Sequence, residues 1–581
     1  MTDDIRTKKL INAPEDIISH ALDGMISAHP DMLMVKGATG RAVVAKDGPR
    51  DGKVGIIIGG GSGHEPAFAG YVGRGLADAA AVGNVFASPS PEQILDAAKA
   101  ADGGAGVVFL YGNYTGDVMN FDMAAESCER LGIPARSVQV TDDVASAPKG
   151  REEERRGIAG DFFVFKIAGA AAELGRDLEA CVAAAHHAND NCRSMGVALT
   201  ACSMPQTGKL NFDIGHDEME IGMGIHGEPG MRRGPLETAD AVTDELMEMI
   251  LADMPLGQGD EVAVLVNGLG ATGQLELYIL HRRVARILAD RGVKIHYSWV
   301  GEYCTSLEMA GASVTLLKLD DDLKTLLDVP CRTPALTVAG ALAPKGAHTT
   351  RQHAQTSRQT AQDRSTLKTD GTISPAGFRT MILAAADAIF ANRDWLSELD
   401  GVIGDGDHGI TMDIGFSAIR AELAQDQDET ITGMSNRMGK AFLDAVGASS
   451  GPLYASAFQT AGAAVADRLN LDAAAMVAWI EGLHDGIVAR GGASVGDKTM
   501  VDAYVPAVTA AKDARDAGGD VGACLAAAVE GAQVGRDATA HMTSKRGRSK
   551  KLGERSVGHI DPGAASAHIL FVALRDAAAA L

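Results

Sequence analysis

Short apolar runs alternate with amphipathic stretches through roughly the first 335 residues of the chain. The runs 54–58, 105–110 and 262–267 each lead from a strand-like pattern into a loop, and 336–338 is a short late candidate. Continuous apolar strands that alternate with helices are typical of a mostly parallel sheet covered on both faces. We therefore expect residues 1–343 to form an α/β domain with two subdomains and with ligands beyond the carboxyl ends of the strands.

The polar pattern changes at residues 344–371, which are dominated by Thr, Gln, Ser, Arg and Asp and which we expect to form a linker. After it, Ser374 and Pro375 provide a helix N-cap and a proline at the first helical position. Apolar residues then recur at helical spacing in about eight segments, which begin near residues 376, 409, 430, 452, 471, 497, 520 and 562. The pattern predicts an all-α bundle or helical barrel over residues 372–581.

Composition narrows the function classes. A chain of 581 residues with 46% hydrophobic and 22% charged residues is typical of a globular protein with several compact units. The net charge of −23 argues against a nucleic-acid partner. The seven cysteines are scattered, no run reaches membrane-spanning length, and the N-terminus does not resemble a signal peptide. We expect a cytoplasmic enzyme without a membrane partner.

Three aspartates, Asp400, Asp405 and Asp407, lie among glycines within the segment 399–409. Carboxylates so close together repel unless a hard cation such as Mg²⁺ lies between them. An EF-hand is excluded, because Phe416 stands where that loop requires a glutamate. A solvated Asp-Gly turn is the alternative, but such a turn needs only one aspartate. The segment therefore predicts a metal site shared with nucleotide phosphates.

The first glycine loop, 59–66, contains Gly61, Ser62, Gly63 and His64. It matches neither a dinucleotide fingerprint nor a hydrolase nucleophile elbow. A Walker motif is also missing, since Asp497 interrupts the closest candidate in the chain. The loop brings backbone amides, a hydroxyl and an imidazole together, although His64 could equally be a hydrogen-bonded structural histidine.

Two further loops carry candidate catalytic groups. Asp117 follows the strand that ends near Leu110, where it could accept a proton from a substrate hydroxyl or cap the next helix. His226 lies in the glycine-rich loop 221–230, and this context predicts an exposed, rigidly held nucleophile or ligand rather than a packing residue.

In the helical half, the loop 447–452 could present helix N-terminal amides to a phosphate. The segment 545–551 is the only dense basic run of this half, and it precedes the glycine-bounded loop 558–563. It is either a solvated surface or a mobile segment that helps to neutralise transferring phosphate charge.

Together these motifs resemble the single-chain, ATP-dependent dihydroxyacetone kinases, over nearly the whole length and in the same order. The segments 60–66, 113–117 and 224–228 resemble that family's ketose-binding domain. The segments 399–409, 553–556 and 561–564 resemble its nucleotide-binding domain. Several long motifs in register are far more specific than any one of them.

The resemblance implies roles for the ketose-binding residues. His226 would attack the ketose carbonyl and hold the substrate as a covalent hemiaminal, which fixes a small polar molecule in one geometry. Asp117 would be the general base for the primary hydroxyl, and His64 would hydrogen-bond the substrate or share the proton transfer. Gly61, Ser62 and Gly63 would complete this pocket.

The resemblance also implies an ATP site with two Mg²⁺ ions held by Asp400, Asp405 and Asp407. It assigns to the nucleotide pocket the residues His408, Gly409, Thr411, Ser449, Ser450, Gly491, Met500, Arg548, Asp561, Pro562 and Gly563. The family's second domain is a barrel of eight helices, and its members are dimers. A homodimer is therefore expected, in which one subunit's ATP site could act on a ketose held by the other.

One departure concerns the substrate. Gly112 stands where the family commonly has a lysine before its Asn-Tyr-Thr-Gly-Asp motif, so a four-carbon ketose such as erythrulose becomes an alternative to dihydroxyacetone. Three rival functions remain open: a phosphocarrier-dependent ketose phosphotransferase, a ketose sensor without turnover, and a lyase acting on nucleotide-linked substrates. The absence of a phosphocarrier domain and the presence of the aspartate trio favour the ATP-dependent kinase.

Overall fold

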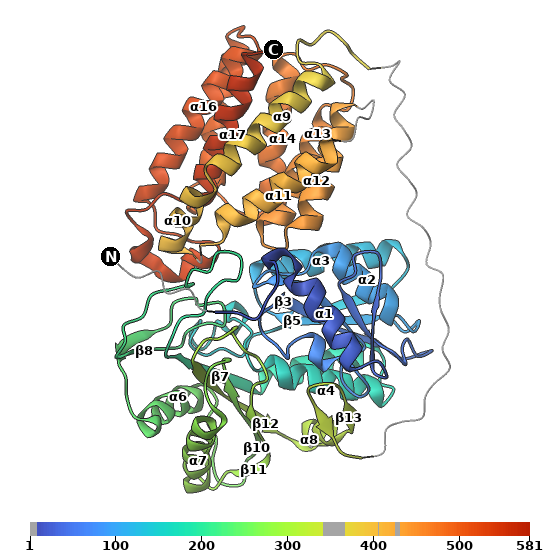
Figure 1. Cartoon of the computed structure of the whole chain (residues 1–581), viewed down its shortest axis with the longest axis vertical. Coiled ribbons are helices and arrows are strands. Elements are labelled where there is room, and N and C mark those ends of the chain that lie inside the picture. Colours follow the sequence, from blue (N-terminus) through green and yellow to red (C-terminus); the bar gives the residue numbers. More distant parts are fainter. Residues whose placement is uncertain (1–7, 341–366, 405, 425–429) are drawn as a thin grey trace. The chain divides into compact units, whose positions relative to one another are not determined.

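The computed structural model describes residues 8–340, 367–404, 406–424 and 430–581, which are drawn in colour in Figure 1. The chain divides into two compact units, Met1–Thr356 and Ser357–Leu581. Most of the predicted linker 344–371 lies outside the described residues. Its described end packs on the second unit, where the backbones of Lys368 and Arg468 form an isolated β-bridge.

The first unit contains a six-stranded sheet in the order β1-β2-β4-β3-β5-β6. Strands β4, β3, β5 and β6 run parallel to one another, whereas β2 is antiparallel to both of its neighbours, β1 and β4. Every residue of β3 and β5 is buried, as expected for strands covered on both faces. The strands are β1 (Leu33–Lys36), β2 (Ala42–Ala45), β3 (Gly55–Ser62), β4 (Ala79–Val85), β5 (Val107–Gly112) and β6 (Ala135–Val140).

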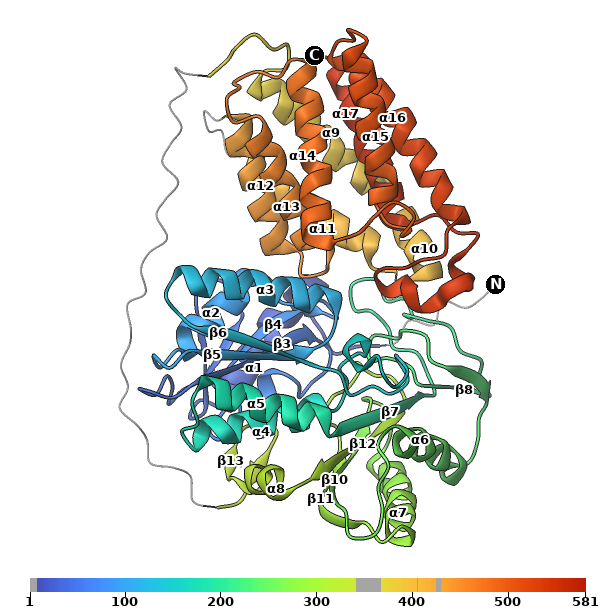
Figure 2. The same ribbon diagram turned by 180° about the vertical axis from the view of Figure 1, so that it is seen from behind.

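Two pairs of helices cover this sheet, one pair on each face (Figure 2). Helices α2 (Pro91–Ala101) and α3 (Thr115–Arg130) pack on one face, and α4 (Asp161–Glu173) and α5 (Leu178–Asp190) pack on the other. Ser90 begins α2 with a capping box, in which its side chain accepts from the amide of Gln93. The α/β expectation is confirmed for this sheet.

A second six-stranded sheet has the order β11-β10-β12-β7-β8-β9. Only its β10–β11 pair is parallel, so the mostly parallel order expected for this half holds in the first sheet and not in the second. Helices α6 (Ala239–Asp253) and α7 (Gln274–Asp290) pack against it. Its strands are β7 (Cys192–Ala198), β8 (Glu218–Ile221), β9 (Arg232–Pro235), β10 (Glu261–Gly268), β11 (Lys294–Gly301) and β12 (Gly311–Leu319).

Two further α-helices and two short strands belong to the first unit. Helix α1 contributes Ile18 and Leu22 to the core, and α8 contributes Leu323 and Leu326. The late candidate at 336–338 forms half of a two-stranded ribbon. These elements are α1 (Ile17–Ala28), α8 (Asp321–Asp328), β13 (Cys331–Arg332) and β14 (Thr337–Val338).

The described residues of the second unit form nine α-helices, and the all-α expectation is confirmed. Eight of them begin within a few residues of the predicted starts. The ninth, α10, was not predicted. The helices are α9 (Pro375–Ala391), α10 (Arg393–Ile403), α11 (His408–Leu423), α12 (Ile431–Ala445), α13 (Ser450–Ala464), α14 (Ala473–Gly491), α15 (Val501–Asp516), α16 (Val521–Ala538) and α17 (Pro562–Ala578).

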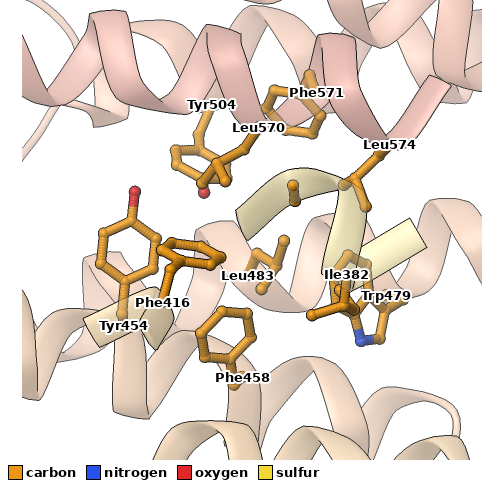
Figure 3. Close-up of a pocket in the computed structure, with 11 residues that line it drawn as sticks. Ile382, Phe416, Tyr454, Phe458, Trp479, Leu483, Tyr504, Leu570, Phe571 and Leu574 are labelled. Carbon is orange, nitrogen blue, oxygen red and sulfur yellow. The ribbon is translucent and has the colours of Figure 1, made fainter. Parts of the chain in front are cut away.

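Small residues let these helices approach closely. A Cβ atom added at Gly535 of α16 would lie 1.9 Å from the Asp502 carbonyl oxygen of α15, so no side chain fits there. Aromatic and aliphatic side chains meet in the interior around a cavity of about 20 Å³ (Figure 3). The cavity has room for about one water molecule. Its lining is Ile382, Ala385, Phe416, Tyr454, Phe458, Trp479, Leu483, Tyr504, Leu570, Phe571 and Leu574.

Within the described ranges, no helix combines the length and the apolar character that a membrane crossing requires.

Candidate functional site

His64 lies just beyond the carboxyl end of β3, where the loop is held by the segment 305–307. Its Nδ1 atom lies 2.7 Å from the carbonyl oxygen of Thr305, and the amide of Leu307 donates to Gly63 O at 2.7 Å. Gly63 has a φ of +101°, and an added Cβ atom would lie 2.9 Å from the Phe86 ring, so both backbone and space require glycine. Ser62 donates its hydroxyl to Gly83 O at 2.8 Å.

His226 lies in the loop between β8 and β9, and its backbone is fixed from both sides. Its amide donates to Glu228 Oε2 at 3.0 Å, and its carbonyl accepts from Asn211 Nδ2 at 3.0 Å. Its side chain is only 9% exposed. The expectation of an exposed histidine was therefore wrong, because neighbouring loops and rings cover the glycine-rich segment.

The structure brings the two histidines together. Nε2 of His64 lies 3.1 Å from Nε2 of His226, and the two rings meet edge to face. Phe86 stacks on His64 with ring centroids 5.0 Å apart, and the rings of Phe86 and Tyr114 both stand perpendicular to His226. Burial, followed by the charge of His226, lowers the pKa of His64 to about 3. His64 is therefore neutral near neutral pH.

A buried chain of charges continues behind His226. Its Nδ1 atom lies 3.1 Å from Glu228 Oε1, and Glu228 Oε2 lies 3.9 Å from Arg156 NH1. Arg156 also pairs with Asp143 at 2.7 Å and donates to Gly222 O at 3.0 Å. Burial alone would lower the pKa of Arg156, but the charges of Asp143 and Glu228 raise it. The guanidinium is therefore a permanent cation beside Glu228.

Asp117 lies in the first turn of α3, three residues after Tyr114, whose ring contacts His226. Burial raises the pKa of the neighbouring Asp161 well above its usual range, and the charges of Asp142 and Asp117 add to this effect. Carboxyl groups thus gather at the carboxyl ends of the β5 and β6 strands. Such groups at a strand end suit proton transfer with a bound hydroxyl.

Gly112 is the last residue of β5, and two other residues lie close to it. A Cβ atom added there would lie 3.2 Å from Cε2 of Tyr114 and 3.3 Å from the carbonyl oxygen of Gly157. A side chain at position 112 would therefore press on the tyrosine that packs against His226.

The predicted aspartate segment spans the end of α10 and the start of α11 in the second unit. Asp400 is a helical residue, and its Oδ2 accepts the amides of Asp407 and His408 at 3.0 and 3.3 Å. Burial and the charge of Asp400 raise the pKa of Asp407 to about 7. Asp405 lies outside the described residues.

A second loop end meets this segment. Nε2 of His408 lies 2.9 Å from the Ser566 hydroxyl in the first turns of α17. Asp561 caps α17 by accepting the amide of Ala564 at 2.8 Å. Burial raises the pKa of Asp561 to about 7 despite that hydrogen bond, and the charge of Asp400 contributes to the shift. Asp400 therefore lies close enough to both Asp407 and Asp561 for its charge to affect them.

The loop 492–500 closes the same region. Lys498 is buried and donates to the carbonyl oxygens of Thr539 and His559 at 2.8 and 2.5 Å. Met500 begins α15, and its Cβ lies 3.3 Å from a Cβ atom built at Gly563, which follows Pro562.

Apart from Arg548, the other residues predicted for the nucleotide pocket lie in, or directly before, helices α11, α13 and α14. Gly409 has no room for a side chain, since an added Cβ atom would lie 1.9 Å from Arg393 O. Thr411 and Ser450 are buried, and Ser449 precedes α13. Gly491 is the last residue of α14, and a Cβ atom added there would lie 2.8 Å from the Leu453 side chain.

The last residues of the basic segment are helical. Arg548 begins a 3₁₀ helix, Arg548–Ser556, although the Arg548 side chain lies outside what the structure describes. Arg546 donates to Gly492 O at 2.7 Å and so ties this segment to the loop 492–500.

The described acidic residues suit a divalent cation by their chemistry. The charge of Asp400 contributes to the raised pKa values of both Asp407 and Asp561, and a cation would offset this repulsion. Among the described residues, however, no three metal-binding side chains already converge on one point.

Several neighbours of these sites were not singled out from the sequence. Glu228 stands in the His226 motif, and its spacing of two residues could have suggested a partner. Phe86 and Thr305 reach the histidines, and Arg156 reaches Glu228, through chain folding alone, and no sequence signal marks them. Lys498 is a comparable case in the second unit.

Comparisons with known proteins cover both units. A Dak1 domain matches residues 23–335, and a DAK2 domain matches residues 402–576. Two curated relatives from Mycolicibacterium smegmatis are an L-erythrulose 1-kinase and a D-erythrulose kinase. The first is 39% identical over 97% of this chain and 98% of its own length, and the second is 40% identical over 96% of each.

A solved structure extends the likeness to the fold. The dihydroxyacetone kinase from C. freundii, crystallised with AMP-PNP and Mg²⁺, has a TM-score of 0.53 and 30% identity over 98% of this chain and 99% of its own. The chain belongs to the dihydroxyacetone kinase family.

Proposed function

We propose that this protein transfers a phosphoryl group from ATP to a primary hydroxyl of a small ketose, which it holds as a hemiaminal on His226. The observation that carries the proposal is the buried His64–His226 pair, at 3.1 Å, in a chain 39% identical to an L-erythrulose 1-kinase. Kinase activity is supported by the curated relatives, and ATP as the donor is supported by the relative crystallised with AMP-PNP and Mg²⁺. The tether and the individual residue roles are our proposal.

The tether would use the Nε2 lone pair of His226. Glu228 accepts from the other ring nitrogen, so the ring is held in one orientation with Nε2 toward His64. Attack on the carbonyl carbon converts weak binding of a small polar molecule into a fixed geometry. It also selects ketones and aldehydes over glycerol, which has no carbonyl group.

Asp117 would act as the general base for the hydroxyl that receives the phosphoryl group. The side chain lies one helical turn beyond Tyr114, which contacts the tethering histidine. Removal of the proton from a positioned hydroxyl typically contributes about 10²- to 10⁴-fold to the rate.

In the second unit, Asp400 and Asp407, together with Asp405, would hold Mg²⁺. The family resemblance implies two such ions. When bound, Mg²⁺ neutralises phosphate charge and orients the phosphoryl group. Asp561, His408 and the loop 492–500 would surround the nucleotide, since they meet at this end of the helices. We further propose a homodimer.

The substrate we favour is a four-carbon ketose. Gly112 replaces the family lysine, and the two erythrulose kinases are relatives over nearly the full length. The stereochemistry of the sugar is left to experiment, because one relative is named for L-erythrulose and the other for D-erythrulose.

The test is ADP release with Mg-ATP over dihydroxyacetone, D- and L-erythrulose, glyceraldehyde and glycerol. We expect ketose-dependent release, with erythrulose preferred and glycerol inactive. Folded protein that binds Mg-ATP but releases no ADP with any ketose would contradict the proposal and favour a phosphocarrier-dependent or sensing protein. Faster turnover of dihydroxyacetone than of erythrulose would contradict the substrate assignment alone.

A further inference from the structure

Lys498 is a buried cation to which the proposed function gives no role of its own. It belongs to the loop 492–500, and the residue is 1% exposed. Its φ of +60° is rare for a residue other than glycine and persists only where the surroundings fix the backbone. The carboxylate of Asp502 provides this support, since it accepts the amide of Gly496 at 2.6 Å and that of Thr499 at 2.8 Å, on either side of the lysine. The loop is therefore held in a form that buries the Lys498 side chain.

The ammonium group of Lys498 joins two other segments of the second unit. Its Nζ atom donates to the carbonyl oxygen of Thr539, directly after α16, at 2.8 Å, and to that of His559, in the loop before α17, at 2.5 Å. The amide of Gly558 links the same two segments, because it donates to Ala540 O at 2.7 Å. Hydrogen bonds from a charged donor are stronger than those between neutral groups. Lys498 thus fastens its own loop to both segments at once.

These two segments hold Asp561. The amide of Asp561 donates to Thr539 Oγ1 at 2.9 Å, and its carboxylate caps α17 by accepting the amide of Ala564 at 2.8 Å. Burial lowers the pKa of Lys498, and the charges of Asp561 and Asp502 oppose this shift, so the ammonium lies near both carboxylates. Removal of the ammonium would take one hydrogen bond from each of the two segments that place Asp561.

We infer that Lys498 is a positioning residue of the nucleotide site, which acts on the nucleotide through the two segments that hold Asp561. This inference rests on the proposed function, since that function places Asp561 beside the nucleotide.

A double-mutant cycle between Lys498 and Asp561 tests the inference. The readout is the affinity of the full chain for Mg-AMP-PNP, measured by titration calorimetry. Lys498→Met removes the ammonium and keeps a long side chain. Asp561→Ser removes the carboxylate, and serine caps a helix as well as aspartate does.

We expect each single variant to lower the affinity for Mg-AMP-PNP by about tenfold. The double variant should lose no more than either single variant, because both changes act on the same contact with the nucleotide. A lysine that stabilises the helices without acting through Asp561 would instead give losses that multiply, to about a hundredfold in the double variant.

Lys166→Met is the matched control. Lys166 is also a buried lysine that donates to a backbone carbonyl oxygen, that of Leu326 at 3.0 Å, but it belongs to α4 of the first unit. Its loss should leave the affinity for Mg-AMP-PNP unchanged even where it lowers the Tm. Lys498→Arg should recover most of the affinity that Lys498→Met loses, since a guanidinium can also donate to two carbonyl oxygens.

Thr539→Val provides a second route to the same contact if Lys498→Met fails to fold. Valine has the shape of threonine but cannot accept the amide of Asp561. This variant should also lose about tenfold in affinity for Mg-AMP-PNP, and its loss should not add to that of Asp561→Ser.

Folded Lys498→Met with wild-type affinity for Mg-AMP-PNP, or a double variant whose losses multiply, would overturn the inference. A parallel loss of ketose affinity in Lys498→Met, measured without nucleotide, would also overturn it, because the effect would then be a general loss of structure. Wild-type protein without affinity for Mg-AMP-PNP, or unchanged affinity in Asp561→Ser, would instead overturn the proposed nucleotide site. The two failures are therefore distinguishable.

Discussion

The Nε2 atoms of His64 and His226 lie 3.1 Å apart, although 162 residues separate the two histidines in the chain. His64 follows a strand of the first sheet, and His226 follows a strand of the second. Thr305 O fixes one ring and Glu228 fixes the other. A ketose site at this pair therefore depends on the packing of both sheets of the first unit.

The burial of His64 predicts a loss of stability in acid. Its folded pKa, about 3, is lower than its ordinary value of 6.5, so the unfolded chain binds more protons between these values. Stability from this group is present above pH 6.5 and falls as the pH drops toward 3, by at most ~1.4 kcal/mol per pH unit. His64→Asn should flatten this dependence in hydrogen exchange of peptides from β3 and β5. An unchanged slope would show that His64 is already protonated in the folded protein.

Asp117→Asn should separate chemistry from binding. If Asp117 is the general base, the variant should bind erythrulose as the wild type does, while kcat falls by about 10²- to 10⁴-fold. Calorimetry without nucleotide measures binding, and ADP release measures turnover. A variant that loses ketose affinity and keeps kcat would assign Asp117 to substrate binding instead.

Asp407→Asn should weaken the response to Mg²⁺. Removal of one ligand should raise the Mg²⁺ concentration needed for half-maximal ADP release by about tenfold or more. Asp413→Asn is the control, because Asp413 lies on the same helix and pairs with Arg393. EDTA should abolish activity in all three proteins, and added Mg²⁺ should restore it. Equal Mg²⁺ requirements in the variant and the wild type would remove Asp407 from the metal site.

Gly112→Lys should alter substrate preference. The new side chain would press on Tyr114, whose ring packs against His226, so kcat/KM for erythrulose should fall by about tenfold relative to dihydroxyacetone. Gly24→Lys is a suitable control, since an added Cβ atom at Gly24 has no neighbour within 4 Å. An unchanged ratio of the two substrates would show that position 112 does not determine specificity.

The strands that carry the first glycine loops could be predicted because they are continuous apolar runs between turn residues. Strand β12 was missed, and with it the mixed order of the second sheet, since its antiparallel partners lie far away in sequence. Helix α10 was missed because Asp400-Gly401 favours a turn. Burial of Leu396 and Ile403, two helical turns apart, overrides that local preference.

The candidate histidines and aspartates could be chosen from sequence because glycine-rich motifs surround them. The surroundings of these side chains could not be predicted from the sequence. The burial of His226 comes from Phe86 and Tyr114, and the charge beside Glu228 comes from Arg156, in a segment with no motif of its own. Contacts of this kind depend on long-range packing.

The most direct test of the central claim is ketose-dependent ADP release by the wild type, His226→Ala and His216→Ala, with Mg-ATP affinity measured in parallel. His216 is a matched control, because its side chain is 99% exposed and pairs with the adjacent Asp217. We predict that His226→Ala loses at least about a hundredfold in kcat/KM for the ketose while it still binds Mg-ATP, and that His216→Ala matches the wild type. Wild-type turnover of the ketose by folded His226→Ala would contradict the covalent tether.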